Sequence, residues 1–226
     1  MLDGIRNIKK LFTSKKIKPE QLETTKNDVP FYVFIHGAGQ TRRSWNFIIS
    51  KLRLNSQQYM CMEYNSDLPF YENLEYLTVA LMTVPDNSAF VSHSLGGIYA
   101  LHLYKLKPQK FSTSVSISTP FKGSSTADIL KFLSPNTLLY RDVGCRAKPI
   151  IEAQAVKIDI PWTQIISIHG NSPWMAKPND GIVTVKSQKH RTDVDQVEVY
   201  ANHQEILACT EVVGIIKANT ITKHNN

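Results

Sequence analysis

The sequence predicts an α/β protein whose mostly parallel sheet is covered by helices on both faces. Apolar runs of strand length alternate along the chain with segments whose apolar residues recur at helical spacing, as expected for such a sheet. Residues 31–36, FYVFIH, are a continuous aromatic and β-branched run typical of a strand buried on both faces. The 226 residues, 42% of them hydrophobic, suffice for one globular domain that buries about 70% of its unfolded-chain surface. Ligands are expected at the carboxyl ends of the strands.

The first elements follow this alternation. Residues 41–54 have apolar side chains at helical spacing, and residues 59–64 form a second short apolar run. Residues 73–84 again have helical spacing and stop before Pro85, which cannot continue a helix. The order is therefore strand, helix, strand, helix.

The later elements repeat the pattern around one interruption. Residues 89–91 predict a strand, residues 96–106 a helix that ends before Pro108, and residues 112–118 another strand. After the interruption, strands are expected at 163–169 and 196–200, and a closing helix at 204–217.

Residues 121–161 interrupt the alternation of strands and helices with a mixed stretch that contains helical pieces and many apolar residues. We expect a short lid-like insertion that covers an apolar pocket. The alternative is that these side chains simply pack on the core.

The N-terminal residues account for most of the basic character of the chain. The formal net charge is +7, and residues 1–18 contain six basic residues and one acid, so the rest of the chain is nearly neutral. Apolar residues lie on one helical face of this segment, which would suit contact with an anionic membrane surface. A terminal helix packed on the domain, or a frayed arm, is the preferred interpretation. Residues 19–30 are read as a linker, 31–217 as the domain and 218–226 as a polar tail.

Several classes of protein are excluded by composition. No run approaches the roughly 18 apolar residues of a membrane-spanning helix, and the N-terminus lacks the apolar stretch of a secretory signal. Three cysteines are too few, and odd in number, for a disulfide framework, so a reducing, cytoplasmic location is expected, with peripheral membrane contact as an option. The sequence has no CxxC or HxxxH pair, no phosphate loop and no dinucleotide fingerprint. We therefore expect no metal, no cofactor and no nucleic acid partner.

The most distinctive motif is VSHSLGG at residues 91–97, between an expected strand and an expected helix. A tight turn from strand to helix would expose Ser94 at the top of the sheet as a nucleophile. The residues two before and two after it must be small, and Ser92 and Gly96 are. The N–H of Leu95, at the helix start, could donate to an oxyanion.

This motif resembles the Gly-x-Ser-x-Gly nucleophile elbow of α/β-hydrolases of the lipase and esterase type, with Ser92 in place of the first glycine. The segment His36-Gly37-Ala38-Gly39 ends the first strand and resembles the His-Gly-x loop of that family. The resemblance implies that the N–H of Ala38 is the second oxyanion donor, with Gly37 and Gly39 letting the backbone approach the substrate. His36 is expected to brace the loop.

The family's chain order, serine then acid then histidine, directs attention to Asp180 and His203. Asp180 follows a late strand and precedes a turn glycine, and His203 precedes the closing helix. The resemblance assigns His203 as the base and Asp180 as its orienting acid. The rivals are Asp159, Asp193 and Asp195 for the acid, and His93, His102, His169, His190 and His224 for the base.

Residues 118–124, STPFKGS, are similar to a Pro-x-x-Gly-Ser segment of bacterial lipases and related deacylases. This likeness narrows the resemblance to the lipase-like branch. Ser124 or Ser125 is expected to cap a helix start, and the segment could simply shape a pocket wall. Gln204 and Glu205 do not reproduce the calcium ligands that some lipases carry near the histidine loop.

Together these motifs predict a serine esterase of the EC 3.1.1 type that cleaves lipid-like or other hydrophobic acyl esters through an acyl-enzyme. Two alternatives remain open at the level of sequence. One is an acyltransferase with the same triad, and the other is an inactive binding protein on the hydrolase scaffold, which Ser92 encourages.

Overall fold

The computed structural model describes residues 29–124, 127, 142–170, 172, 175 and 177–221. Six strands form one sheet in the order β2-β1-β3-β4-β5-β6, and every pairing is parallel. The strands are β1 (Tyr32–Ile35), β2 (Tyr59–Met62), β3 (Ser88–His93), β4 (Phe111–Ile117), β5 (Trp162–Ser167) and β6 (Asp195–Val199).

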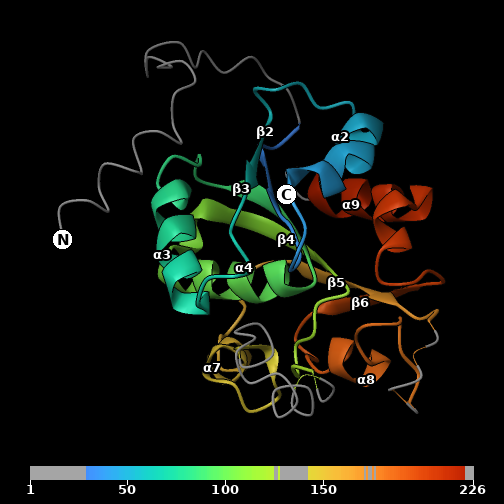
Figure 1. Ribbon diagram of the computed structural model, residues 1–226. Coiled ribbons are helices and arrows are strands. Elements are labelled where there is room, and N and C mark those ends of the chain that lie inside the picture. Colours follow the sequence, from blue (N-terminus) through green and yellow to red (C-terminus); the bar gives the residue numbers. More distant parts are fainter. Residues whose placement is uncertain are drawn as a thin grey trace.

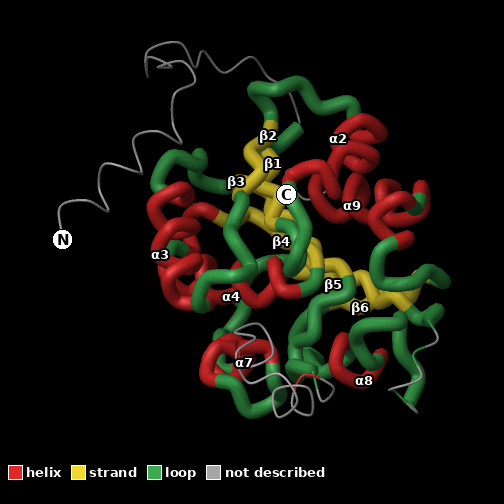
Figure 2. The backbone as a smooth tube through the Cα atoms, in the orientation of Figure 1, coloured by secondary structure: helices red, strands yellow, loops and turns green. Residues whose placement is uncertain are grey.

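Helices cover both faces of this sheet, as Figure 1 and Figure 2 show. The helices α3 and α4 pack on each other over one face, where α7 also contacts α4, and α2 packs against α9 on the other face. Short 3-10 turns precede β4, α2 and α9. The helical elements are η2 (Arg42–Trp45), α2 (Asn46–Leu52), α3 (Phe70–Leu81), α4 (Leu95–Leu106), η3 (Pro108–Lys110), α7 (Lys148–Gln154), α8 (Val185–Gln188), η4 (Glu205–Ala208) and α9 (Thr210–Ile221).

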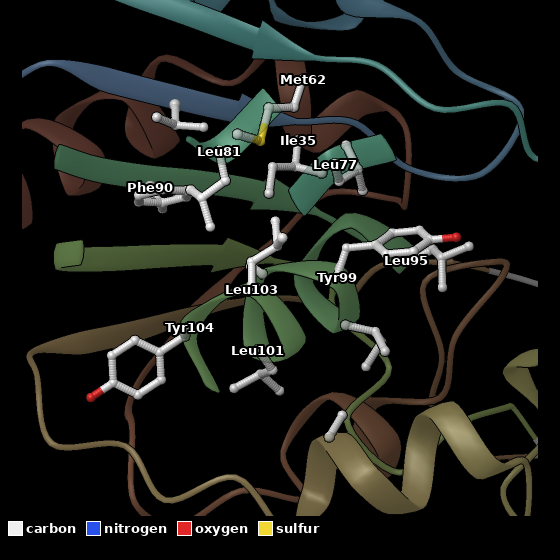
Figure 3. Close-up of a cluster of buried hydrophobic side chains, with 14 of the residues drawn as sticks. Ile35, Met62, Leu77, Leu81, Phe90, Leu95, Tyr99, Leu101, Leu103 and Tyr104 are labelled. Carbon is white, nitrogen blue, oxygen red and sulfur yellow. The ribbon is translucent and has the colours of Figure 1, made fainter. Parts of the chain in front are cut away.

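The two faces of the sheet bury separate apolar clusters. On the α3 and α4 side, Ile35 and Phe90 of the sheet pack with Leu77, Leu81 and Leu103 of the helices (Figure 3). The helical spacing predicted for residues 73–84 is confirmed, because Leu77 and Leu81 are fully buried. The other cluster joins β1, β3 and β4 to α2 and α9.

Several boundaries differ from the prediction, and two helices differ most. The helix expected to begin at residue 73 begins at Phe70, whose N–H donates to Asp142 Oδ2 across the fold. The helix expected at 204–217 is divided into η4 and α9 at Cys209, whose backbone is extended with a φ of −82° and a ψ of 128°. Helix α9 then continues to Ile221, into the region expected as tail.

Two other predictions concern segments that lie partly or wholly outside the described residues. Of the lid-like insertion, the described part includes α7, in which Ile150 and Ala153 are buried against the core as the alternative interpretation expects. Residues 128–141, and the basic segment 1–18 with its possible membrane contact, lie outside the described residues. Within the part of the chain that is described, no helix is long and apolar enough to cross a membrane.

Candidate active site

Ser94 occupies the turn between β3 and α4 with a backbone conformation that is unusual for a residue with a side chain. Its φ is 52° and its ψ is −122°, and its N–H donates to the carbonyl of Ile117 on the neighbouring strand. A Cβ atom on Gly96 would lie 2.4 Å from the carbonyl oxygen of Ile35, so only glycine fits there. The turn therefore has the geometry of a nucleophile elbow.

Ser92 fits into the position where the family has glycine. It is fully buried within β3, where it pairs with Ile35 of β1 and Ser116 of β4. Its Oγ has no hydrogen-bond partner among the described atoms. The hydroxymethyl group is thus accommodated without blocking the elbow, but its hydroxyl is buried and unsatisfied.

Ser94, His203 and Asp180 form a continuous hydrogen-bonded chain. The Oγ of Ser94 lies 3.0 Å from Nε2 of His203, and Nδ1 of His203 lies 2.7 Å from Oδ2 of Asp180. His203 and Asp180 are buried, whereas Ser94 is partly exposed. The three residues predicted from chain order are brought together, separated by 109 and 23 positions in the sequence. This chain can move a proton from a serine hydroxyl to an imidazole.

The carboxylate of Asp180 is held in place by several donors. Oδ1 accepts from the backbone N–H groups of Ile182 and Val183, and Oδ2 accepts from Gln188 Nε2 and Ser167 Oγ as well as from His203. Burial by itself would raise the pKa of Asp180, but these hydrogen bonds and the charge of His203 outweigh it and lower the pKa below its usual value. Asp180 is therefore an anion fixed in one orientation toward His203.

Sequence reasoning missed three of the residues that support Asp180. Ser167 ends β5, and Gln188 lies on α8, a helix of four residues that is too short to show periodicity. Gly170 packs so closely on the Asp180 loop that a Cβ there would lie 2.0 Å from the carbonyl carbon of Asp180. In the sequence, Gly170 itself was the one available sign of this contact, because two backbone segments can approach so closely only at a glycine.

The loop that follows β1 lies close to Ser94, since a Cβ atom on Gly37 would be 3.1 Å from the Cβ of Ser94. Gly37 N donates to Gln40 Oε1, and Gly39 N donates to Ser66 Oγ. The N–H groups of Ala38 and Leu95 have no acceptor among the described atoms. These two are the donors that the resemblance assigns to an oxyanion hole.

His36 lies below this loop rather than facing Ser94. Its Nδ1 contacts the Gly37 carbonyl at 2.8 Å, its Nε2 accepts from Tyr64 N, and its ring stacks on Tyr64 at 4.5 Å. Burial lowers the pKa of His36. These contacts agree with the expected bracing function.

His93, one of the rival histidines, joins two loops next to Ser94. It does not contact Ser94, but its Nε2 lies 2.9 Å from the carbonyl oxygen of His203, and its Nδ1 lies 2.9 Å from Gln40 Oε1. Complete burial, followed by the nearby charge of His203, lowers the pKa of His93 to about 3. His93 is thus a neutral link between Gln40, in the loop after β1, and the backbone of His203.

The rival acids and histidines have other partners or lie on the surface. Asp159 pairs with Lys157, and Asp193 pairs with Arg191. His102 contacts the carbonyl of Pro149, and His169 is exposed and stacks on Tyr200, with ring centroids 4.3 Å apart. Asp195 and His190 are exposed, and His224 lies outside the described residues.

The lipase-like segment supports the Asp180 carboxylate. Ser118 Oγ lies 2.7 Å from Ser167 Oγ, and Ser167 in turn donates to Asp180, so Ser118 is the donor in the first contact. Ser124 Oγ accepts from Ala127 N, as expected for a cap. Among the described residues, no three His, Cys, Asp or Glu side chains are grouped to hold a metal ion.

Solved structures that superpose on this chain include a lipase, a thioesterase domain and a phospholipase. A lipase from Bacillus licheniformis, BlEst2 in its mature form, superposes with a TM-score of 0.65 at 15% identity, over 88% of this chain and 95% of the lipase. A thioesterase domain from the curacin biosynthetic pathway has a TM-score of 0.56 at 14% identity, over 83% of this chain and 90% of the domain. The phospholipase PlaB from Legionella pneumophila has a TM-score of 0.59 at 12% identity, over 70% of this chain and 44% of that protein.

Comparison of the sequence with family models and with curated proteins finds no match. The structural similarity, together with the parallel six-stranded sheet, shows that the chain has the α/β-hydrolase fold.

Proposed function

We propose that this protein is a serine hydrolase that cleaves carboxylic esters through an acyl-enzyme on Ser94. The observation that carries the proposal is the hydrogen-bonded chain from Ser94 through His203 to a buried, well-bonded Asp180. The structural similarity to a lipase, a thioesterase domain and a phospholipase supports ester chemistry.

In the acylation step, Ser94 Oγ forms a bond to the carbonyl carbon while His203 Nε2 takes the hydroxyl proton. The N–H groups of Ala38 and Leu95 stabilise the oxyanion, and removal of one such donor typically costs about 10²–10³ in kcat. The bond to the leaving oxygen then breaks, and His203 returns the proton to that oxygen. Water repeats the sequence: His203 takes its proton, its oxygen attacks the acyl carbon, and Ser94 leaves with the proton.

The acyl group would lie beside Leu95, whose N–H is one of the two donors. The cavity next to Leu95 has both apolar and polar walls and only about 10 Å³ of space, so it does not hold an acyl group as it stands. Its lining residues are Ser66, Leu68, Phe70, Asn73, Leu95, Tyr99 and Asp142.

The test is labelling by a fluorophosphonate probe together with turnover of 4-nitrophenyl esters. We expect stoichiometric labelling and ester cleavage by the wild type, and neither by a folded Ser94→Ala variant. Folded wild-type protein inert to both would support the binding-protein alternative. Products formed only when an alcohol acceptor is added would instead support an acyltransferase.

A further inference from the structure

An open hollow of about 580 Å³ lies next to the candidate active site, between the η2 and α2 segment and the η4 turn. Its inner wall is formed by Gln40 and Gln204, whose side chains are joined by a 2.7 Å hydrogen bond from Gln40 Nε2 to Gln204 Oε1. The other lining residues are Gly39, Thr41, Arg43, Ser44, Asn46, Phe47, Leu207 and Ala208.

The hollow is on the side of the site where a leaving group must lie. His203 has to return its proton to the leaving atom, so that atom lies within hydrogen-bonding distance of Nε2. Gln204 directly follows His203 in the chain, and Gln40 contacts His93 beside Ser94. Over the other face of the sheet, the cavity next to Leu95 has only about 10 Å³, which is space for about one water molecule. Of these two cavities, the hollow is therefore the one with room for a sizeable substrate group.

The charge of the hollow is positive. Arg43 lines it, no carboxylate is among the described residues that line it, and Arg43 has no ion pair with any described acid. Lys51 does not line the hollow, but its Nζ lies 5.6 Å from the centre of the ring of Phe47, which does. The adjacent Arg42 does not line the hollow, and the carboxylate of Glu63 accepts its backbone N–H. The two neighbouring arginines thus have different surroundings.

We propose that this hollow binds the leaving group of the substrate and that Arg43 selects an alcohol or thiol that carries a carboxylate or phosphate. The inference rests on the proposed hydrolase function. A guanidinium pairs with either anion through two parallel N–H donors. Phe47 and Leu207 provide an apolar wall against which the carbon frame of the leaving group packs.

The first experiment compares two esters that differ by one charge on the leaving group, 4-nitrophenyl acetate and 3-carboxy-4-nitrophenyl acetate, at 0.15 M salt. We expect Arg43→Gln to lower kcat/KM for the carboxylate ester about five- to tenfold, the size of one charge-assisted contact at a partly exposed site. The neutral ester should change less than about twofold. Arg42→Gln is the matched control, and it should leave the ratio of the two kcat/KM values unchanged.

The second experiment needs no turnover. Binding of 5-hydroxy-2-nitrobenzoate, phenyl phosphate and 4-nitrophenol to the Ser94→Ala variant is measured by calorimetry, with and without Arg43→Gln. We expect Arg43→Gln to weaken binding of the anions and to leave 4-nitrophenol unchanged, and the two anions distinguish carboxylate from phosphate recognition. Equal effects on charged and neutral compounds, equal effects of Arg42→Gln and Arg43→Gln, or no binding of either anion would overturn the inference. Failure of the proposed hydrolysis would appear separately, as absent labelling of Ser94.

Discussion

Gln40 and His93 are joined by a contact of 2.9 Å between Oε1 of the amide and Nδ1 of the imidazole. The same Oε1 accepts the N–H of Gly37, so one amide oxygen connects the loop after β1 to His93 at the end of β3. His93 continues the connection to the carbonyl of His203. Because buried His93 is neutral, its single N–H can donate to only one of these two oxygens at a time. The relative position of the three loops depends on this set of contacts.

We therefore expect Gln40→Leu to lower kcat by about 10²-fold, because a shift of about 1 Å in catalytic groups has effects of this size. The protein should stay folded, since Gln40 is only partly buried. Gln204→Leu is the matched control, because it removes the outer Gln40 contact and retains the two inner ones. The measurement is kcat and KM on 4-nitrophenyl acetate. Equal losses in both variants would show that the inner contacts do not position the site.

Asp180→Asn should lower kcat by about 10⁴-fold with little change in fold, as expected when the acid of a Ser-His-Asp triad is lost. The amide no longer holds His203 in the tautomer that accepts the Ser94 proton. Asp159→Asn is the control, because that acid only pairs with exposed Lys157. Steady-state kinetics with circular dichroism on both variants test the assignment, which a near wild-type rate for Asp180→Asn would contradict.

The backbone strain at Ser94 predicts a difference between two inactive variants. A φ of 52° with a ψ of −122° suits glycine, and such strain costs on the order of 1–3 kcal/mol for other residues. Ser94→Gly and Ser94→Ala both lose the contact with His203, so their comparison isolates the strain. We expect the glycine variant to be more stable by about 1 kcal/mol in urea unfolding. An alanine variant as stable as the glycine variant would show that the turn is unstrained.

The fold and the turn around Ser94 could be predicted because their signals are local. Strand and helix periodicity is visible within short windows, and the elbow around Ser94 is a contiguous motif. Asp180 and His203 needed the chain order of the family, since they lie 23 positions apart and meet only in the folded chain.

The residues that hold the triad in place could not be predicted in this way. Ser167 at the end of β5 meets Asp180 13 positions later in the chain, and Gln40 meets His93 at the end of β3, 53 positions away. Gln188 lies on a single helical turn without a periodic pattern. Such contacts depend on sheet register and loop geometry, and the secondary-structure propensities of the residues do not determine either.

The unsatisfied hydroxyl of Ser92 predicts that its removal is favourable. A buried hydroxyl without a partner costs about 1–3 kcal/mol, so Ser92→Ala should raise the free energy of unfolding by about 1 kcal/mol. Ser116, paired with Ser92 across the sheet, is the control. Its Oγ donates to Gln164 Oε1 and accepts from Trp162 Nε1, so Ser116→Ala should lower stability by about 1–3 kcal/mol. Destabilisation by both substitutions in urea unfolding would indicate that the Ser92 hydroxyl has a partner.

The buried His93 predicts how stability depends on pH. Its pKa is lowered to about 3 in the folded protein from an ordinary value of 6.5, so between these pH values the unfolded chain binds a proton that the folded chain does not. Its contribution to stability is therefore fully present above pH 6.5 and is lost as the pH falls toward 3. Urea midpoints measured from pH 7.5 to pH 4.5 should fall, and His93→Gln should make this decline shallower. Some slope should remain, because burial also lowers the pKa of His36 and His102. An unchanged slope in His93→Gln would mean that His93 is protonated in the folded protein, with both its N–H groups donating to Gln40 and His203.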